Sequence, residues 1–434
     1  MRILVENGCY HLRNMGDVAM LQVTVSRLSH LWPEARIEVL TNAPDLLAMY
    51  CPDAHPVAAR GRRAWFADRT LFGVLYRLAS SRVVHHLSRL ERWIWYTYPS
   101  LAYRWVRLKA RRRTKRNFQD LQTFLEAIFV ADLVVVSGGG DLNDAFKPYA
   151  ITLLHLLGTV IRRGIPTAMF GQGVGPIQNP ELRDWAKAIL PSVDLIAVRE
   201  SRAGPALLSS LGVAPDRVVT TGDDAIELAY EARAEQLGAG IGVNLRVAEY
   251  SEVSSNAIEL VRNALHKAAM KYHTPLIPLP ISFHPRESDV KTIRHLLTGY
   301  DDHSDGGQSL NTPAKVIEEV KRCRVVVTGS YHPAVFALSQ GIPVVGLAKS
   351  AYYTDKLLGL AEQFGTGCQV ISLSDERLQE KLETAIDKAW ESARRVRSPL
   401  LEAARAQIAQ GYAAYQRVYE IVTAHCRKSF EGVR

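Results

Sequence analysis

Side chains that could do chemistry are concentrated where apolar runs of this sequence end in glycine-rich turns. The clearest case is the stretch RVVVTGSYHPAVFALSQGIPVVGL, residues 324–347. Its valine run predicts a buried strand, and Gly329 permits the tight turn that follows. Pro333 suits the first position of a helix, so we expect His332 beside free backbone N–H groups at a helix N-terminus. A histidine there could transfer a proton or bind an anion, or it could only cap the helix.

Further turns carry side chains that could bind sugar hydroxyls. Asn14 and Asp17 lie at the start of the first predicted helix, where the alternative is that they only stabilise the helix terminus. The stretch SGGGDLND follows a second apolar strand, and its three glycines allow close approach of a ligand. The polar side chains of that stretch could equally form turns and caps. The candidate residues of this stretch and of a similar turn, GQGVGP, are Gly139, Gly140, Asp141, Asn143 and Gln172.

Two arginines end apolar strands. Arg199 follows DLIAV, and Arg246 follows GVNL. Arginine binds carboxylates and phosphates through two parallel hydrogen bonds, so an arginine at a strand end can present such a site to a cleft. We expect both side chains to bind anionic groups of a substrate, and an interdomain ion pair is the alternative for each.

Parallel sheets would position these turns, and the chain alternates strands with helices accordingly. Residues 2–42 have the pattern of strand, turn, helix and strand. The alternation breaks near residues 227–240 in a polar, alanine-rich stretch, after which IGVNLR starts a second series. We therefore predict an α/β protein with two doubly wound, Rossmann-like domains that face a cleft, residues 1–230 and 231–400.

The composition fits a globular protein that is too long for a single core. The 434 residues, 47% hydrophobic and 22% charged, predict two domains. No apolar run is long enough to span a membrane, and the opening MRILVENG is typical of a strand rather than a signal peptide. Five scattered cysteines without a Cys-x-x-Cys pair argue against a zinc site and a disulfide framework, and they favour the cytoplasm. The sequence lacks the motifs of NTPases, kinases, zinc proteases and serine hydrolases.

Positive charge is concentrated in one segment, residues 60–116. The segment contains 16 lysines or arginines and two acids, a net charge of +14, whereas the whole chain carries +9. It also holds four of the seven tryptophans. Because aromatic rings and cations together favour lipid headgroups, we expect a helical insertion that lies on an anionic membrane surface. Single-stranded nucleic acid is one alternative partner of this segment, and an acidic substrate that the segment recruits to the cleft is another. We favour the membrane surface and expect no binding of nucleic acid.

The chain resembles the polysaccharide pyruvyl transferase family over most of its length outside the basic segment. The resemblance rests on the order and spacing of NMGDVAML, LVVVSGGGDLND, FGQGVGP, VRES, TGDDA and GSYHPAVFALSQGIPVVGL. It implies a fold similar to that of the two-domain GT-B glycosyltransferases, with a C-terminal helix, residues 401–434, that returns to the first domain. It also implies transfer of a pyruvyl group from phosphoenolpyruvate to two hydroxyls of a sugar, which forms a cyclic ketal and releases phosphate.

The resemblance also implies roles for the candidate residues. His332 would be catalytic, either as the acid that protonates the enol carbon or as a hydrogen-bond donor to the phosphate. No cofactor or metal would be needed. The acceptor would be a cell-envelope glycan or its lipid-linked precursor, met in the cytoplasm or at the inner face of the cell membrane. The donor would be bound by Arg199, Arg246, Gly329, Ser330, Tyr331 and Lys349, and the acceptor by Asn14, Asp17, Gly139, Gly140, Asp141, Asn143 and Gln172.

This chain departs from the family pattern at one position. The family commonly carries Arg-Leu-His where residues 330–332 have Ser-Tyr-His. That arginine would be a natural partner for the donor's phosphate or carboxylate, so Arg199, Arg246, Lys349 or the helix N-terminus has to supply the charge. Two other functions therefore stay open: a glycosyltransferase that uses a nucleotide sugar, and a non-catalytic glycan-binding relative.

Overall fold

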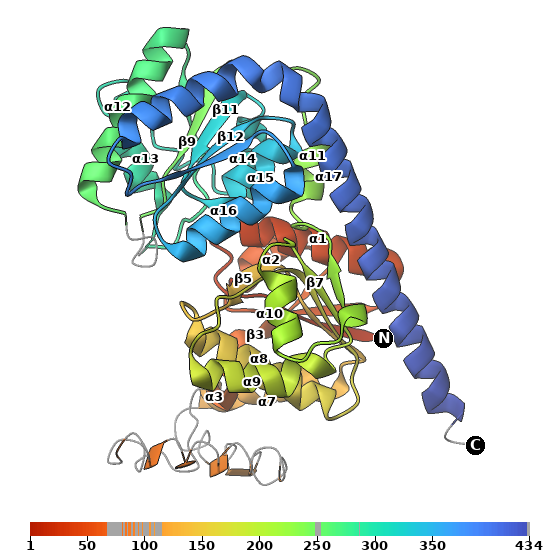
Figure 1. Cartoon of the computed structure of the whole chain (residues 1–434). Coiled ribbons are helices and arrows are strands. Elements are labelled where there is room, and N and C mark those ends of the chain that lie inside the picture. Colours follow the sequence, from red (N-terminus) through yellow and green to blue (C-terminus); the bar gives the residue numbers. More distant parts are fainter. Residues whose placement is uncertain are drawn as a thin grey trace.

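The computed structural model describes residues 1–66, 115–247, 253–285 and 287–431, and isolated positions between residues 80 and 108. In this structure the chain folds into two α/β domains that are stacked and flanked on one side by a long C-terminal helix (Figure 1). Most of the segment that we expect on a membrane surface, residues 60–116, lies outside the described residues.

The first domain is built on one parallel sheet, with strand order β3-β2-β1-β4-β6-β7-β8 and with β5 paired to β6. The strands are β1 (Arg2–Glu6), β2 (Arg36–Thr41), β3 (His55–Ala58), β4 (Leu133–Val136), β5 (Gly139–Leu142), β6 (Thr167–Val174), β7 (Leu195–Val198) and β8 (Val218–Thr220). The helices are α1 (Met15–Leu31), α2 (Pro44–Tyr50), α3 (Ala59–Phe66), α7 (Lys115–Val130), α8 (Lys147–Ile161), α9 (Pro180–Ile189), α10 (Gly204–Ser210) and α11 (Ile226–Glu231).

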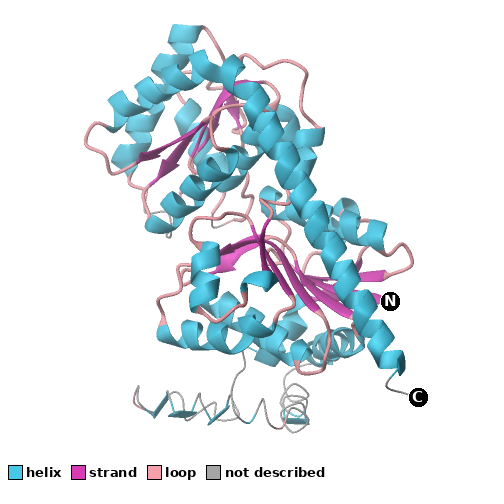
Figure 2. Cartoon of the chain, turned by 45° about the vertical axis from the view of Figure 1, so that its right-hand side comes forward, coloured by secondary structure: helices cyan, strands magenta, loops and turns pink. Residues whose placement is uncertain are grey.

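Both faces of this sheet are buried, because successive side chains of each strand point to opposite sides. On β1, Ile3 and Val5 belong to the core that includes Leu21 of α1. Between them, Leu4 belongs to the opposite core, which includes Phe124 of α7. Helices flank each sheet on both sides (Figure 2), so the predicted doubly wound architecture is confirmed.

The second domain repeats this plan with a smaller parallel sheet, in the order β10-β9-β11-β12-β13. Its strands are β9 (Gly240–Asn244), β10 (Leu276–Pro278), β11 (Cys323–Thr328), β12 (Val344–Ala348) and β13 (Cys368–Ser372). Its helices are α12 (Ser255–Tyr272), α13 (Asp289–Leu297), α14 (Pro313–Val320), α15 (Tyr331–Ser339) and α16 (Ala351–Phe364).

The C-terminal helix α17 (Leu378–Glu431) belongs to both domains. It starts against the second domain and ends in the first, where the Tyr415 ring stacks on Phe170 with centroids 3.6 Å apart. The C-terminal helix that we expected from residue 401 is the later part of α17, which is continuous from Leu378 to Glu431. The buried Val396, Leu400 and Ala404 continue one apolar stripe across that position, at a spacing of four residues.

The two domains touch through backbone hydrogen bonds at the cleft. The N–H of Met15 at the start of α1 donates to the carbonyl of Ile281, and the N–H of Phe283 donates to the carbonyl of Arg13, at 2.9 and 2.8 Å. These bonds fix the start of α1 against the loop that follows β10. Within the described residues, no helix has both the length and the apolar character needed to cross a membrane.

Candidate active site

A cavity of about 510 Å³, counting the part open to solvent, lies between the two domains where strands of both sheets end. This size is ordinary for a small-molecule site. The cavity brings together nine of the residues that the sequence predicted, and five that it did not. Its lining residues are Asn14, Asp17, Gly140, Asp141, Phe146, Arg199, Arg246, Ile281, Ser330, Tyr331, His332, Tyr352, Tyr353 and Lys356.

His332 lies in the first turn of α15, which begins at Tyr331 with Ser330 as its N-cap. The helix therefore starts two residues before Pro333, where we had expected its first residue. Proline is tolerated at this third position too, because the first N–H groups of a helix have no partner within the helix. The His332 side chain is buried, with Nε2 3.9 Å from Oδ2 of Asp223. Burial, together with the nearby cations Arg199, Lys356 and Arg246, holds the pKa of His332 well below its usual value.

The N-terminus of α1 closes over the imidazole ring. A Cβ atom at Gly16 would lie only 1.9 Å from Cγ of His332 and 2.0 Å from Nδ1. Gly16 therefore allows a helix of the first domain to contact the candidate catalytic residue of the second. The same helix end is capped by Asn14, whose Oδ1 accepts from the N–H of Gly16 at 3.1 Å.

Arg199 reaches the cavity from the end of β7. Its guanidinium carbon lies 4.1 Å from the centroid of the Tyr331 ring, and Nη1 lies 3.7 Å from Oδ2 of Asp223. A Cβ at Gly173 or Gly140 would approach Nη2 to 2.6 or 2.8 Å, so both glycines leave room for this side chain. Nη2 is buried and has no hydrogen-bond partner in the described part of the chain. It is available to an anion in the cavity.

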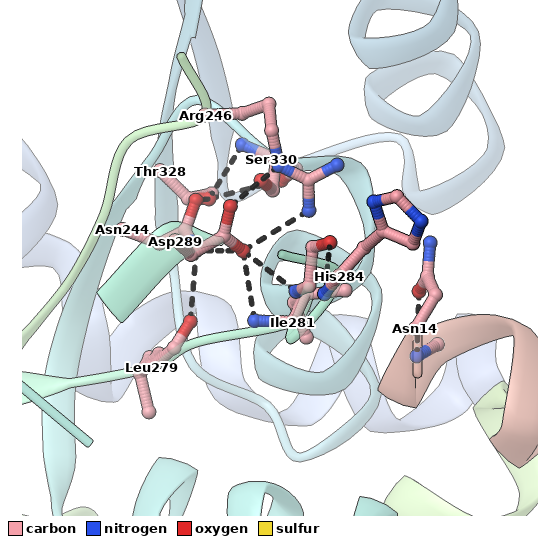
Figure 3. Close-up of polar contacts among 11 residues, drawn as sticks. Asn14, Asn244, Arg246, Leu279, Ile281, His284, Asp289, Thr328 and Ser330 are labelled. Atoms are coloured by element: carbon pink, nitrogen blue, oxygen red, sulfur yellow. Dashed lines mark hydrogen bonds and ion pairs between the residues drawn. The ribbon is translucent and has the colours of Figure 1, made fainter. Parts of the chain in front are cut away.

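Arg246 lines the cavity from the second domain and is held by an ion pair with Asp289 (Figure 3). Its Nε and Nη2 donate to the two carboxylate oxygens of Asp289, at 2.5 and 3.0 Å. Asp289 also accepts from the backbone N–H groups of Ile281 and Ser282, at 2.8 and 2.9 Å. The predicted strand-end position is found, but the ion pair lies within the second domain and partly offsets the charge of Arg246.

Ser330 completes an anion-accepting helix end. Its N–H donates to Oγ1 of Thr328, and that hydroxyl donates back to the Ser330 carbonyl, both at 2.9 Å (Figure 3). Its own hydroxyl caps no backbone group and is buried without a partner in the described residues. A serine hydroxyl therefore stands where the family carries an arginine, beside the first N–H groups of α15.

Two carboxyl groups face this positive region from the first domain. Asp17 and Asp141 both line the cavity, and burial raises the pKa of each. For Asp17, burial and the neighbouring Asp141 raise the pKa to about 7. Burial also raises the pKa of Asp223, behind His332, to about 6. Carboxyl groups with such pKa values can exchange protons near neutrality.

Three further residues at or near the cavity were not predicted from the sequence. The Tyr352 hydroxyl, on α16, donates across the cleft to the carbonyl of Gly140 at 2.8 Å. Lys356, one turn later, donates to that hydroxyl and lies 3.8 Å from the Tyr352 ring centroid. Burial and the charge of Arg199 hold the pKa of Lys356 well below its usual value. Asp223 lies in the motif TGDDA, to which the sequence analysis gave no role.

Five predicted residues do not line the cavity: Gly139, Asn143, Gln172, Gly329 and Lys349. Asn143 and Gln172 instead fix its backbone. Asn143 bonds to the carbonyl of Gly140 at 2.5 Å, and Gln172 bonds to the carbonyls of Ser137 and Phe170 at 2.9 and 2.8 Å. Among the described residues, no group of three or more His, Cys, Asp or Glu side chains is placed to hold a metal ion.

Two Rossmann-like domains that face a cleft define the GT-B class of fold, and solved structures support this assignment. A putative UDP-N-acetylglucosamine 2-epimerase from Listeria monocytogenes matches with a TM-score of 0.55 and 12% identity, over 98% of this chain and 97% of that one. The UDP-GlcNAc 2-epimerase from Neisseria meningitidis bound to UDP-GlcNAc matches with a TM-score of 0.53 and 13% identity, over 99% and 100% of the two chains. At these identities the likeness is one of fold alone.

The sequence itself identifies the family. The family model of the polysaccharide pyruvyl transferases matches residues 14–350, which include every residue that lines the cavity except Tyr352, Tyr353 and Lys356. The chain therefore belongs to the polysaccharide pyruvyl transferase family. Among curated protein sequences, none matches this chain.

Proposed function

We propose that this protein transfers a pyruvyl group from phosphoenolpyruvate to two hydroxyls of a sugar, with release of phosphate. One observation carries the proposal: three buried polar atoms without a described partner surround one cavity. They are Nη2 of Arg199, Oγ of Ser330 and Nε2 of His332. A small, highly charged anion that carries both a carboxylate and a phosphate would satisfy such a set.

The donor's negative charge would be bound by Arg199, Lys356 and the N-terminus of α15. Arg199 and Lys356 would stand in for the arginine that the family has at position 330, because both line the cavity, whereas Lys349 is not among its lining residues. Because the cations Arg199, Lys356 and Arg246 contribute to the low pKa of His332, a bound trianion would offset them and raise that pKa. Donor binding would then protonate His332 and prepare the acid.

The reaction proceeds through two additions at the same carbon. His332 gives a proton to the methylene carbon of phosphoenolpyruvate, and the first sugar hydroxyl attacks the adjacent carbon as positive charge develops there. Asp17 or Asp141 accepts the proton of that hydroxyl. The carbon–oxygen bond to phosphate then breaks, and the second hydroxyl closes the ketal and gives up its proton to the departing phosphate.

The same proposal includes the acceptor and its location. We propose a cell-envelope glycan or its lipid-linked precursor as acceptor, and an anionic membrane surface as the partner of the basic segment, residues 60–116. The composition of that segment supports this: its cations and tryptophans suit a headgroup layer, and a lipid-linked acceptor would be found there. No cofactor takes part in the proposed reaction.

Calorimetric titration with phosphoenolpyruvate tests the donor, with UDP-N-acetylglucosamine and other nucleotide sugars as competitors. Phosphate release in the presence of a glycan panel then tests the transfer. We expect phosphoenolpyruvate to bind and nucleotide sugars not to. Binding of a nucleotide sugar alone would favour glycosyl transfer, and binding of neither would favour a glycan-binding relative without activity. In the variant Ser330→Arg, newly created phosphoenolpyruvate binding would mean that the native donor is a different anion.

A further inference from the structure

A second polar cluster lies beside the cavity, where β1 ends and α3 begins. Its centre is Glu6, which accepts from the hydroxyl of Tyr149 at 3.0 Å and from the hydroxyl of Tyr10. Nη1 of Arg62 lies 3.5 Å from the same carboxylate oxygen. Glu6 and Arg62 are 0% and 3% exposed, whereas the two tyrosines are partly exposed. The cluster thus has a buried charged floor beneath two aromatic side chains.

Arg62 also fixes the orientation of both rings. Its guanidinium carbon lies 4.8 Å from the ring centroid of Tyr149 and 5.5 Å from that of Tyr10, within the range of cation–π attraction. The two ring centroids are 6.2 Å apart, and the ring planes are inclined by 54°. The contacts with Glu6 and Arg62 therefore hold the ring faces of Tyr10 and Tyr149 at a fixed angle to each other.

The floor still has unused hydrogen-bonding capacity. Oε2 of Glu6 and Nε and Nη2 of Arg62 are buried without a partner among the described residues. Native proteins rarely leave such atoms unpaired, so each calls for an ordered water or a ligand group. The set contains donors and acceptors together, which suits hydroxyl groups.

The cluster is continuous with the candidate active site through Gly8 and Asp141. A Cβ atom at Gly8 would lie 2.2 Å from Oδ2 of Asp141 and 3.6 Å from Cζ of Tyr149. Asp141 is one of the carboxyl groups that line the cavity. A ligand held on the two rings would therefore lie directly beside a sugar bound at Asp141.

We propose that Tyr10 and Tyr149 form a second sugar subsite, which binds the unit next to the one that receives the pyruvyl group. A sugar ring presents C–H groups on its face, which pack on aromatic rings, and hydroxyls at its edge, which bond to polar groups such as the tyrosine hydroxyls. Arg62 faces the Glu6 carboxyl group, whose pKa is raised to about 7 by burial, so at neutral pH the cluster carries at most one positive charge. A neutral sugar fits such a cluster better than a highly charged anion does. Glu6 and Arg62 are positioning residues in this subsite.

This inference rests on the proposed function, and its test separates the two. Saturation-transfer NMR and calorimetry would compare the binding of cello-, malto-, laminari- and galacto-oligosaccharides of one, two and three units. Phosphoenolpyruvate binding is measured in the same samples. We expect at least one disaccharide to bind about tenfold more tightly than its monosaccharide, and Tyr149→Ala to abolish that difference. Failure of phosphoenolpyruvate to bind would overturn the proposed donor, whatever the sugars do.

Further variants separate positioning from folding. Arg62→Met should raise the KM for the oligosaccharide about tenfold and leave the affinity for phosphoenolpyruvate unchanged, and Arg62→Lys should restore part of the loss. Tyr149→Phe keeps the ring and should keep most of the disaccharide preference. Tyr272→Ala is the matched control, because this tyrosine also bonds to a carboxylate beside a cation but lies in the second domain. Equal binding of mono- and disaccharides by the unaltered protein would overturn the subsite.

Discussion

Replacing Gly16 by alanine tests whether the position of the His332 ring controls the reaction. Gly16 is the second residue of α1, and the added methyl carbon would lie 1.9 Å from Cγ of His332. Carbon atoms in contact are about 3.5 Å apart, so the ring has to retreat by roughly 1.6 Å. A displacement of about 1 Å can slow a reaction by about 10²-fold. We expect turnover to fall at least about a hundredfold, which is about 2.7 kcal/mol of activation free energy.

Phosphate release from phosphoenolpyruvate with an acceptor glycan measures this turnover, and thermal melting measures folding. Gly16 has no positive φ, so alanine fits the helix and should stabilise it by up to about 1 kcal/mol. That gain opposes the strain at the cleft, and we expect the melting temperature to stay within a few degrees of the unaltered protein.

The control is His332→Ala, made alone and together with Gly16→Ala. His332→Ala should itself lower turnover by at least about a hundredfold, the low end for a lost proton-transfer group. Without the imidazole the methyl group displaces nothing, so the double variant should be no slower than His332→Ala. Additive losses, or normal turnover in a folded Gly16→Ala protein, would refute the reasoning.

Other predictions concern the donor, the carboxyl groups and the basic segment. Arg199→Met should weaken phosphoenolpyruvate binding by about 1.5–3 kcal/mol, roughly 10- to 160-fold in Kd by calorimetry, and an unchanged Kd would remove Arg199 from the donor site. The pKa of Asp17 rises from 3.8 to about 7 on folding. Between about pH 4 and 7 the native state therefore keeps a proton that the unfolded state has lost. The free energy of unfolding should fall as pH rises through this range. Asp17→Asn should flatten that part of the profile in denaturant melts, and identical slopes would contradict the assignment. The intact protein should co-sediment with anionic vesicles at low salt and a variant lacking residues 60–116 should not; binding to single-stranded nucleic acid instead would favour the other partner.

The strand ends of this protein could be predicted because parallel sheets bring them together. Asp141, Arg199 and His332 each follow an apolar run, and the carboxyl ends of such strands share one edge of a sheet. Tyr352 and Lys356 could not be found in this way. They lie one turn apart on α16, and only the packing of the second domain against Gly140 turns them toward the cleft.

The sequence also could not show which of two adjacent aspartates faces the candidate site. In TGDDA, Asp223 faces Arg199 and His332, whereas Asp224 points away and pairs with Arg27 at 3.0 Å. Two consecutive aspartates thus take unrelated positions: Asp223 lies behind His332, and Asp224 lies under α17. The start of α15 was misplaced for a local reason, because proline is compatible with several positions of a first turn.

The path of α17 has a consequence for the order in which the two domains can complete their folding during synthesis. The core of the first domain includes Tyr415 and Val418, yet the last strand of that domain ends at Thr220, about 195 residues earlier. At a synthesis rate of about 5–20 residues per second, roughly 10–40 s pass between the two. Throughout that interval the surface around Phe170 stays uncovered while the second domain is still being made. The first domain to leave the ribosome is therefore the last to be completed, and a nascent chain stalled before residue 415 carries an open apolar face.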